Sequence, residues 1–152
     1  MRSDAKSATT LEAVRRVQHT RCFVCASQPP NGLGVEYLPR GDGAVEATVP
    51  CLKLWEGYKG LVHGGIVAAL LDGAMTNCLF ARGVVAVTAD MQVRFRHPLH
   101  IGASAFIEAR ITRQSGPLFV LRGAISQEGQ VKATAVAKFM RCPPAPTNGD
   151  LT

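Results

Sequence analysis

The stretch with the clearest chemical potential is HGGIVAALLDGAM, residues 63–75, because it places a carboxylate among apolar residues. Asp72 stands in the middle of a segment that should be buried. Burying an unpaired charge is costly, so a buried carboxylate is paired, hydrogen-bonded or kept for a purpose. Partial desolvation also makes a carboxylate more basic. Asp72 is therefore a candidate general base or nucleophile, and the structural alternative is an acid that faces a subunit contact or solvent.

Gly64 and Gly65 begin the same segment and predict the start of a helix. Two glycines leave backbone N–H groups free, with no side chain to block a ligand. Such an N-terminus favours negative charge, as on a carbonyl oxygen that becomes tetrahedral. Asp72 lies about 11 Å further along the helix, too far for both groups to act on one carbonyl. A second copy of the helix, alongside in a dimer, would bring the two together, so we expect a site shared between subunits.

The element that must position these groups is a helix from about residue 65 to about residue 81. It is apolar around most of its circumference, and Gly83 is placed to end it. A helix that is apolar nearly all round must be enclosed by other elements.

After this helix the apolar residues alternate with polar ones, which predicts four strands at 87–96, 106–112, 118–126 and 131–139. QEGQ predicts a hairpin turn between the last two strands, and PRGDG predicts a hairpin that precedes the helix. The economical arrangement is α+β, with one antiparallel sheet curled around one helix. We expect the four strands to form a meander.

The two ends of the chain contribute less. We predict an N-terminal extension, residues 1–20, frayed to about residue 8 and followed by a short helix at 10–18, with Thr9 and Glu12 at capping-box spacing. The main domain covers 21–141, and the Pro-rich tail 142–152 is predicted to be disordered. The first twenty residues do not resemble a signal peptide and no run of 18 apolar residues occurs, so we expect a cytoplasmic protein without a membrane span.

Composition narrows the class of partner. Hydrophobic residues make up 47% and charged residues 18% of the 152, which is typical of one globular domain and not of a disordered chain. The net charge of +6 favours an anionic partner such as a phosphate-bearing ligand. Aromatic content of only 6% and the lack of a dense basic run argue against nucleic acid.

The five cysteines are odd in number and scattered, which fits a reducing compartment. Cys22 and Cys25 form a C-x-x-C motif. No second pair and no nearby histidine completes a four-ligand zinc set, so we expect structural thiols and no metal.

Two segments resemble a known family. GYKGLVHGGIVAALLDGAM (57–75), with the later TADMQVRFRHPL (88–99), is similar to the PaaI-type branch of the hotdog-fold acyl-CoA thioesterases. CFVCASQPPNGLGVEY (22–37) resembles the lead-in of many members, and the likeness covers roughly residues 20–141. It implies the hotdog fold, one long central helix wrapped by a curved antiparallel sheet of five to six strands. It also implies a homodimer or homotetramer that hydrolyses an acyl-CoA thioester to a carboxylic acid and coenzyme A.

The resemblance also implies roles for single residues. Asp72 matches the catalytic acid, acting as general base or nucleophile, and the Gly64 N–H matches the group that polarises the thioester carbonyl, with Gly65 beside it at the substrate. His63, also a candidate catalytic residue, is expected to shape the start of the helix; a direct catalytic role is the alternative. Thr88 matches a Ser or Thr that orients the water or the carboxylate; the alternative is an ordinary strand residue. Some relatives carry Asn or Gln where this chain has Gly57, so that role is unfilled or met by another group, for which Tyr58 is a candidate.

Arginines are the candidate contacts to coenzyme A. Arg94 and Arg96 are predicted on the same strand face as Thr88 and match the family's contacts to nucleotide phosphates, with Arg122 as a third candidate. Guanidinium suits phosphate through forked hydrogen bonds. For the acyl group we predict a pocket formed by side chains of two subunits, including Leu71, Met75, Leu79 and Phe80 near the second half of the helix. Aryl, medium-chain and short-chain acyl groups all remain open. No cofactor is expected besides the coenzyme A of the substrate.

Two other functions fit the same fold. A non-catalytic acyl-CoA-binding protein would bind the thioester without turnover, and the intact Asp72 argues against it. A 3-hydroxyacyl-thioester dehydratase would share acid–base work between a histidine and a carboxylate, and the Gly-Gly after His63 argues against it.

Overall fold

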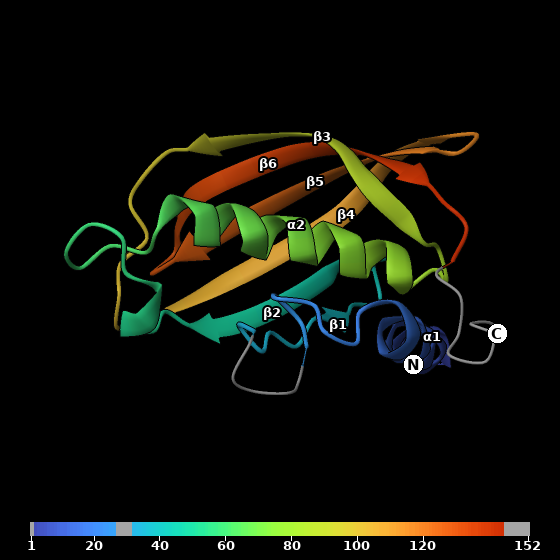
Figure 1. Ribbon diagram of the computed structural model, residues 1–152, viewed down its shortest axis with the longest axis horizontal. Helices are drawn as coiled ribbons and strands as arrows, with labels where there is room; N and C mark the ends of the chain where they lie inside the picture. The colour runs from blue at the N-terminus through green and yellow to red at the C-terminus, as the bar shows by residue number, and fades with distance from the viewer. Residues whose placement is uncertain (1, 27–31, 145–152) are drawn as a thin grey trace, which may run out of the picture.

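The computed structural model describes residues 2–26 and 32–144 of the chain. Its elements, in chain order, are a long helix, two strands, a 3-10 turn, the central helix and four long strands (Figure 1). They are α1 (Arg2–Gln18), β1 (Leu38–Pro39), β2 (Val45–Pro50), η1 (Lys53–Trp55), α2 (Gly64–Phe80), β3 (Ala86–Phe95), β4 (Ser104–Ser115), β5 (Leu118–Gln127) and β6 (Gln130–Arg141).

The central helix α2 lies across one face of a curved antiparallel sheet (Figure 1). From Leu70 to Phe80 nearly every residue of α2 is buried, which explains why its sequence is apolar on all sides. Gly83, with φ +70°, takes the left-handed conformation that ends the helix, and the Val84 N–H donates to the Leu79 carbonyl. The α+β class, the central helix and the hotdog architecture are confirmed.

The sheet has six strands in the order β1-β2-β4-β5-β6-β3. The hairpins β4–β5 and β5–β6 are those expected, and the β5–β6 turn contains Glu128 and Gly129, both with positive φ. The predicted meander holds for β4, β5 and β6, but β3, the first of the four strands, does not follow it. β3 does not pair with β4 but with β6, at the opposite edge of the sheet.

The chain between β3 and β4 explains this difference. It is too long for a tight turn, and Leu99, in its middle, is buried. The Leu99 carbonyl accepts from the Val62 N–H at 2.8 Å, and Leu61 forms an isolated bridge with His100. The connection therefore passes near the N-terminus of α2 and carries the chain from the edge strand β3, past β6 and β5, to the interior strand β4.

A bulge interrupts β3. Thr88 pairs with Phe139 and Asp90 with Lys138, so Ala89 has no partner residue on β6. One extra residue reverses which side chains face the helix. Thr88 lies on the helix side of the sheet, opposite buried Phe139, whereas Arg94, opposite Thr134, lies on the outer side.

The N-terminal helix is longer than predicted. α1 begins at Arg2, so the expectation that residues to about 8 are frayed is wrong. Thr9 is not a cap, because its hydroxyl donates to the Ala5 carbonyl within the helix. Leu11 is buried in the core, and Glu12 pairs with Arg15 and Arg16 on the more exposed side. The apolar side of the helix thus holds it to the domain, while the i,i+3 and i,i+4 ion pairs stabilise the helix itself.

Among the described residues no helix is long and apolar enough to cross a membrane. Most of the segment predicted to be a disordered tail, residues 145–152, lies outside the described residues.

Candidate active site

Asp72 is half-buried in the middle of α2 and faces the edge strand β3. The Thr88 hydroxyl donates to Asp72 Oδ1 at 2.6 Å. A charge-assisted hydrogen bond of this length fixes the carboxylate rotamer and leaves Oδ2 available. Asp72 forms no ion pair within the described part of the chain. The sequence-predicted acid and its Thr partner are therefore brought together.

The surroundings of Asp72 make it more basic. Desolvation by burial raises the pKa of its carboxyl above the usual 3.8, while the hydrogen bond from Thr88 opposes this rise. The Cys22 sulfur adds a smaller upward effect on the pKa and the His19 imidazole a smaller downward one. Both come from the segment that follows α1. A carboxylate with a raised pKa accepts a proton more readily, as a general base must.

His63 is the N-cap of α2. Its Nδ1 accepts from the Gly65 N–H at 2.9 Å, so that amide is occupied. The bond requires an unprotonated Nδ1, which leaves any ring proton on Nε2. This geometry gives His63 a capping role, and a methyl group on Gly65 would lie 3.0 Å from His63 Nδ1.

Gly64 keeps a free backbone N–H. It is exposed, and its amide donates to no acceptor among the residues described. It lines a hollow of about 280 Å³ together with Phe95 and Arg96. An added Cβ on Gly64 would meet only Phe95 ring carbons at 3.7 Å, so a small side chain fits within the chain itself. Of the two glycines, Gly64 is thus the one able to bind an oxyanion.

Gly57 is a glycine for a packing reason. An added Cβ would lie 3.1 Å from His63 Cα and 3.3 Å from His63 Cβ, closer than ordinary contacts. The capping histidine therefore occupies the space that a longer side chain at residue 57 would need. Tyr58 is 87% exposed and points away from the chain, so within one subunit it does not take over the missing role.

Three arginines meet on the outer face of the sheet. Arg94, Arg96 and Arg122 line one hollow of about 350 Å³, from β3, the residue after it, and β5. Arg96 also lines the hollow that contains Gly64. Arg94 and Arg96 were predicted to share a face with Thr88, and the bulge in β3 makes that wrong for both. Arg96, which lines both hollows, connects the arginine groove to the start of α2.

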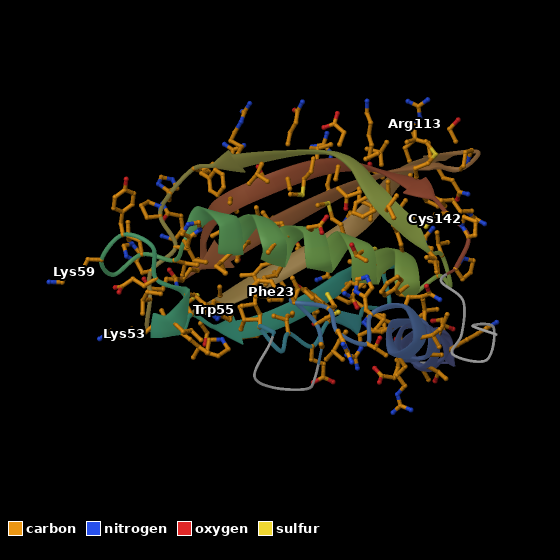
Figure 2. All side chains as sticks on the ribbon, in the orientation of Figure 1. Phe23, Lys53, Trp55, Lys59, Arg113 and Cys142 are labelled. Carbon is orange, nitrogen blue, oxygen red and sulfur yellow. The ribbon has the colours of Figure 1, made fainter. Side chains whose placement is uncertain are left out.

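The acyl pocket predicted from the second half of α2 is wrong within one subunit. The side chains concerned are fully buried in the core, namely Leu71, Met75, Leu79 and Phe80. An apolar hollow of about 410 Å³ lies instead at the N-terminal half of α2, and Phe23, Trp55 and His63 are among the residues that line it. Figure 2 labels Phe23 and Trp55 near each other. Phe23 is 53% exposed in the structure. In the sequence, the only cue to this hollow was an aromatic residue directly after Cys22.

The C-x-x-C motif has a neighbour that the sequence analysis missed. His19, three residues before Cys22, lies with Cys22 and Cys25 in one cluster, so the expectation of no nearby histidine was wrong. The regular H-x-x-C-x-x-C spacing was visible in the sequence. No disulfide joins the cysteines, all five of which are free thiols in the described residues.

Fold and site together define the hotdog class: a helix capped by His-Gly-Gly, enclosed by an antiparallel sheet, with a half-buried acid at its centre. Comparison with known families agrees, because the model of the Thioesterase superfamily matches residues 59–134, half of the chain. The chain belongs to this superfamily, in which its fold resembles the PaaI-like branch.

Individual relatives are more distant. The chain is 24% identical over 146 residues to acyl-coenzyme A thioesterase THEM4 of Mus musculus, covering 93% of this chain and 60% of that protein. The chain thus spans little more than half the length of this relative. PaaI of E. coli, from the phenylacetic acid degradation operon, has a TM-score of 0.76 at 17% identity, over 93% and 97% of the chains. The smu.793 protein of Streptococcus mutans, solved bound to acetyl CoA, has a TM-score of 0.68 at 18% identity, over 74% and 91%.

Proposed function

We propose that the chain hydrolyses acyl-CoA thioesters to a carboxylic acid and coenzyme A. The observation that carries the proposal is the raised-pKa carboxylate of Asp72, held by Thr88, on the same helix as the free N–H of Gly64. Membership of the Thioesterase superfamily and the likeness to acyl-coenzyme A thioesterase THEM4 support it.

The chemistry follows from these two groups. Asp72 Oδ2 accepts a proton from water while the water oxygen attacks the thioester carbon. The carbonyl oxygen becomes an oxyanion that the Gly64 N–H stabilises at the positive end of α2. The tetrahedral intermediate then collapses by breaking the carbon–sulfur bond. The proton on Asp72 passes to the departing thiolate, which leaves the acid and free coenzyme A. A direct attack by Asp72 on the thioester carbon is the nucleophilic variant of the same assignment.

The site is complete only in a pair of subunits. Asp72 follows Gly64 by eight residues, about 12 Å along one helix, so both cannot act on one carbonyl from the same copy. β3, next to Asp72, is an edge strand of ten residues whose Val87 and Phe95 are each 57% exposed. An unpaired, partly apolar edge invites pairing with another copy. We infer a homodimer in which Asp72 of one subunit faces Gly64 of the other.

Coenzyme A then lies along a continuous path. With the thioester at Gly64, the hollow lined by Phe95 and Arg96 leads outward to the groove of Arg94 and Arg122. These guanidinium groups are suited to the phosphates of the nucleotide. The net charge of +6 adds a general attraction for this anionic substrate. The apolar hollow at Phe23 and Trp55, on the other side of the α2 N-terminus, is the best candidate for the acyl group.

A thiol-trapping assay over short-chain, medium-chain and aryl acyl-CoAs tests the proposal. We expect release of coenzyme A by the wild-type chain and a loss of at least about 100-fold in kcat for Asp72→Asn. Glu128→Gln, an exposed acid in the β5–β6 turn, is the matched control and should retain full activity. Binding of acyl-CoA without turnover would favour the non-catalytic alternative. With a 3-hydroxyacyl-CoA added to the panel, loss of its 3-hydroxyl group as water, with the thioester intact, would favour the dehydratase.

A further inference from the structure

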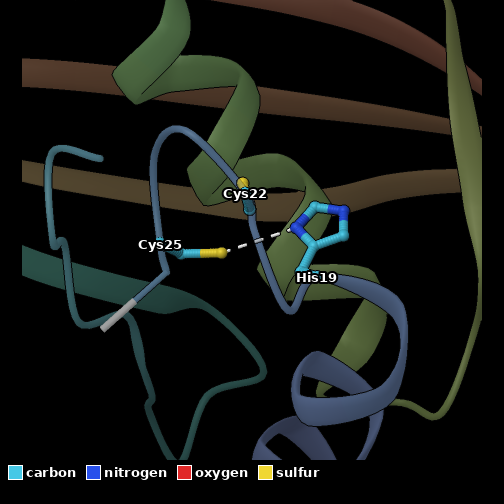
Figure 3. Close-up of side chains that lie close together, drawn as sticks. All are labelled: His19, Cys22 and Cys25. Atoms are coloured by element: carbon cyan, nitrogen blue, oxygen red, sulfur yellow. Dashed lines mark hydrogen bonds between the residues drawn. The ribbon is translucent and has the colours of Figure 1, made fainter. Parts of the chain in front are cut away.

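A cluster of soft ligands lies outside the segment that matches the thioesterase superfamily. His19, Cys22 and Cys25 follow one another at three-residue intervals where α1 ends, and their side chains converge (Figure 3). One ligand atom from each lies within 4.8 Å of the other two, and His19 Nδ1 is 3.4 Å from Cys25 Sγ. None of the three takes part in the proposed hydrolysis.

The separation between His19 Nδ1 and Cys25 Sγ fits two ligands of a tetrahedral zinc ion, and Cys22 Sγ lies within 4.8 Å of both. With zinc–sulfur bonds of about 2.3 Å and zinc–nitrogen bonds of about 2.0–2.1 Å, tetrahedral angles put nitrogen about 3.5 Å and sulfur about 3.8 Å from a neighbouring sulfur. The 3.4 Å between His19 Nδ1 and Cys25 Sγ is close to the first of these values. Imidazole and thiolate are the ligands that zinc prefers over harder cations such as magnesium.

The backbone holds this arrangement without a metal. The Cys22 N–H donates to the His19 carbonyl at 3.3 Å and the Ala26 N–H to the Cys22 carbonyl at 3.0 Å, which closes two successive turns. The His19 ring stands edge-on to Phe80, with ring centroids 4.7 Å apart. A site whose ligands are already oriented loses less entropy when an ion binds.

Two neighbouring side chains interact with Cys25, one of the proposed ligands. Arg15 Nη1 donates to the Cys25 carbonyl at 2.7 Å and places a positive charge near the sulfurs. The side-chain amide of Asn77 contacts Cys25, and its fully buried Oδ1 has no hydrogen-bond partner among the described residues. A buried acceptor without a donor is uncommon. A donor bound at the cluster, such as a metal-bound water, would satisfy this acceptor if it came within hydrogen-bond reach.

We propose that the chain binds one zinc ion through His19 Nδ1, Cys22 Sγ and Cys25 Sγ, with water as the fourth ligand. The ion joins the C-terminal end of α1 to the segment that packs on α2. Val24, between the two cysteines, lies so close to Gly73 that an added Cβ there would be 2.7 Å from Val24 Cγ1. Because Gly73 follows Asp72, the site stabilises the part of the domain that carries the proposed base.

Metal analysis of the full chain tests this proposal independently of any thioesterase activity. Chain purified without chelator should contain about one zinc per subunit, and cobalt should give the charge-transfer absorption of thiolate coordination. Zinc should raise the Tm of the wild-type chain, since it binds the folded state. We expect His19→Gln, Cys22→Ser and Cys25→Ser to lose the cobalt signal and the zinc-dependent Tm shift. Cys142→Ser, at the end of β6 (Figure 2), should keep both.

Cys22→Ser keeps the test decisive even if Cys25→Ser fails to fold, because Cys22 is only half-buried. A wild-type chain without a thiolate–cobalt band would overturn the proposal, as would a band that Cys22→Ser leaves unchanged. Isolation of a metal-free chain with a Cys22–Cys25 disulfide from a reducing medium would also overturn it and would assign the pair to redox chemistry.

Discussion

The hydroxyl of Thr88 donates to Asp72 Oδ1 at 2.6 Å and thereby joins the central helix to the edge strand of the sheet. Thr88 reaches the helix because it precedes the bulge in β3. The bond holds the carboxylate in one orientation and partly offsets the rise in its pKa that burial causes. The edge strand therefore controls both the position and the basicity of the proposed catalytic acid.

Removing this hydroxyl should shift the pH dependence of catalysis. Thr88→Ala deletes a hydrogen bond that lowers the pKa of Asp72, so the pKa of Asp72 should rise further. A general base works in its ionised form. The acid limb of the kcat profile should therefore move to higher pH. Loss of the hydrogen bond that orients the carboxylate should separately lower kcat by about tenfold.

Thr88→Ser is the control for that experiment, because it keeps the hydroxyl and should restore the wild-type acid limb. Other charged or titratable groups that act on Asp72 are His19 and Cys22, with Tyr37 also near enough to sense its charge. The pH profile of Cys22→Ser measures how far the Cys22 thiol shifts the acid limb. If Thr88→Ala lowers kcat without moving the limb, Thr88 positions the substrate or water instead.

The sequence was sufficient for features that depend on local periodicity. The central helix, the β4–β5–β6 hairpins and the helix end at Gly83 follow from spacing of apolar residues and from turn chemistry. The placement of β3 was not available in this way, because a connection anchored to Leu61 and Val62 carries the chain across the sheet. Non-local pairing leaves little trace in the sequence on either side of it.

For the site, sequence reasoning found the residue types but not every orientation. Asp72 and Thr88 are in contact as expected, and His63 caps the helix. The bulge at Ala89 was invisible, because an alternating pattern does not show where one residue is skipped, and so Arg94 and Arg96 were assigned to the wrong face. His19 was overlooked because it belongs to the end of a helix and meets the cysteines only through the turns that follow.

The ionised Asp72 should cost the domain stability. Its pKa is raised in the folded state, so the folded chain binds the proton more tightly than the unfolded chain. The stability that Asp72 contributes is fully present below pH 3.8, the pKa of the unfolded chain. It is lost as the pH rises through the higher pKa of the folded chain. Asp72→Asn should raise Tm by a few degrees at pH 7, measured by calorimetry. The gain should shrink as the pH approaches 4, and a variant destabilised at pH 7 would contradict this account.

The arginine groove should govern substrate affinity more than the chemical step. Arg94→Ala with Arg96→Ala removes two guanidinium groups from the hollow on the outer sheet face. We expect KM for acyl-CoA to rise about tenfold or more, with kcat changed far less, because the phosphates are bound equally in ground and transition states. Arg113→Ala, an exposed arginine near the far end of the sheet (Figure 2), should leave KM unchanged. A fall in kcat at constant KM would refute the phosphate assignment.

A mixture of two inactive variants should recover activity if the site is shared. Asp72→Asn lacks the base. Gly64→Val covers the oxyanion donor with a side chain, and the Cβ of that side chain fits beside the Phe95 ring. In a dimer of one variant with the other, one of the two sites combines an intact Asp72 with an intact Gly64. Random co-assembly makes half the dimers mixed, so activity should reach about a quarter of the wild-type value after co-expression.

Each variant expressed alone should stay inactive. Mass spectrometry should show that mixed dimers have formed. If such dimers recover no activity, the site is not shared between subunits. Because about 12 Å of helix separates Asp72 from Gly64 in one subunit, the proposed pairing of these two groups would then be wrong.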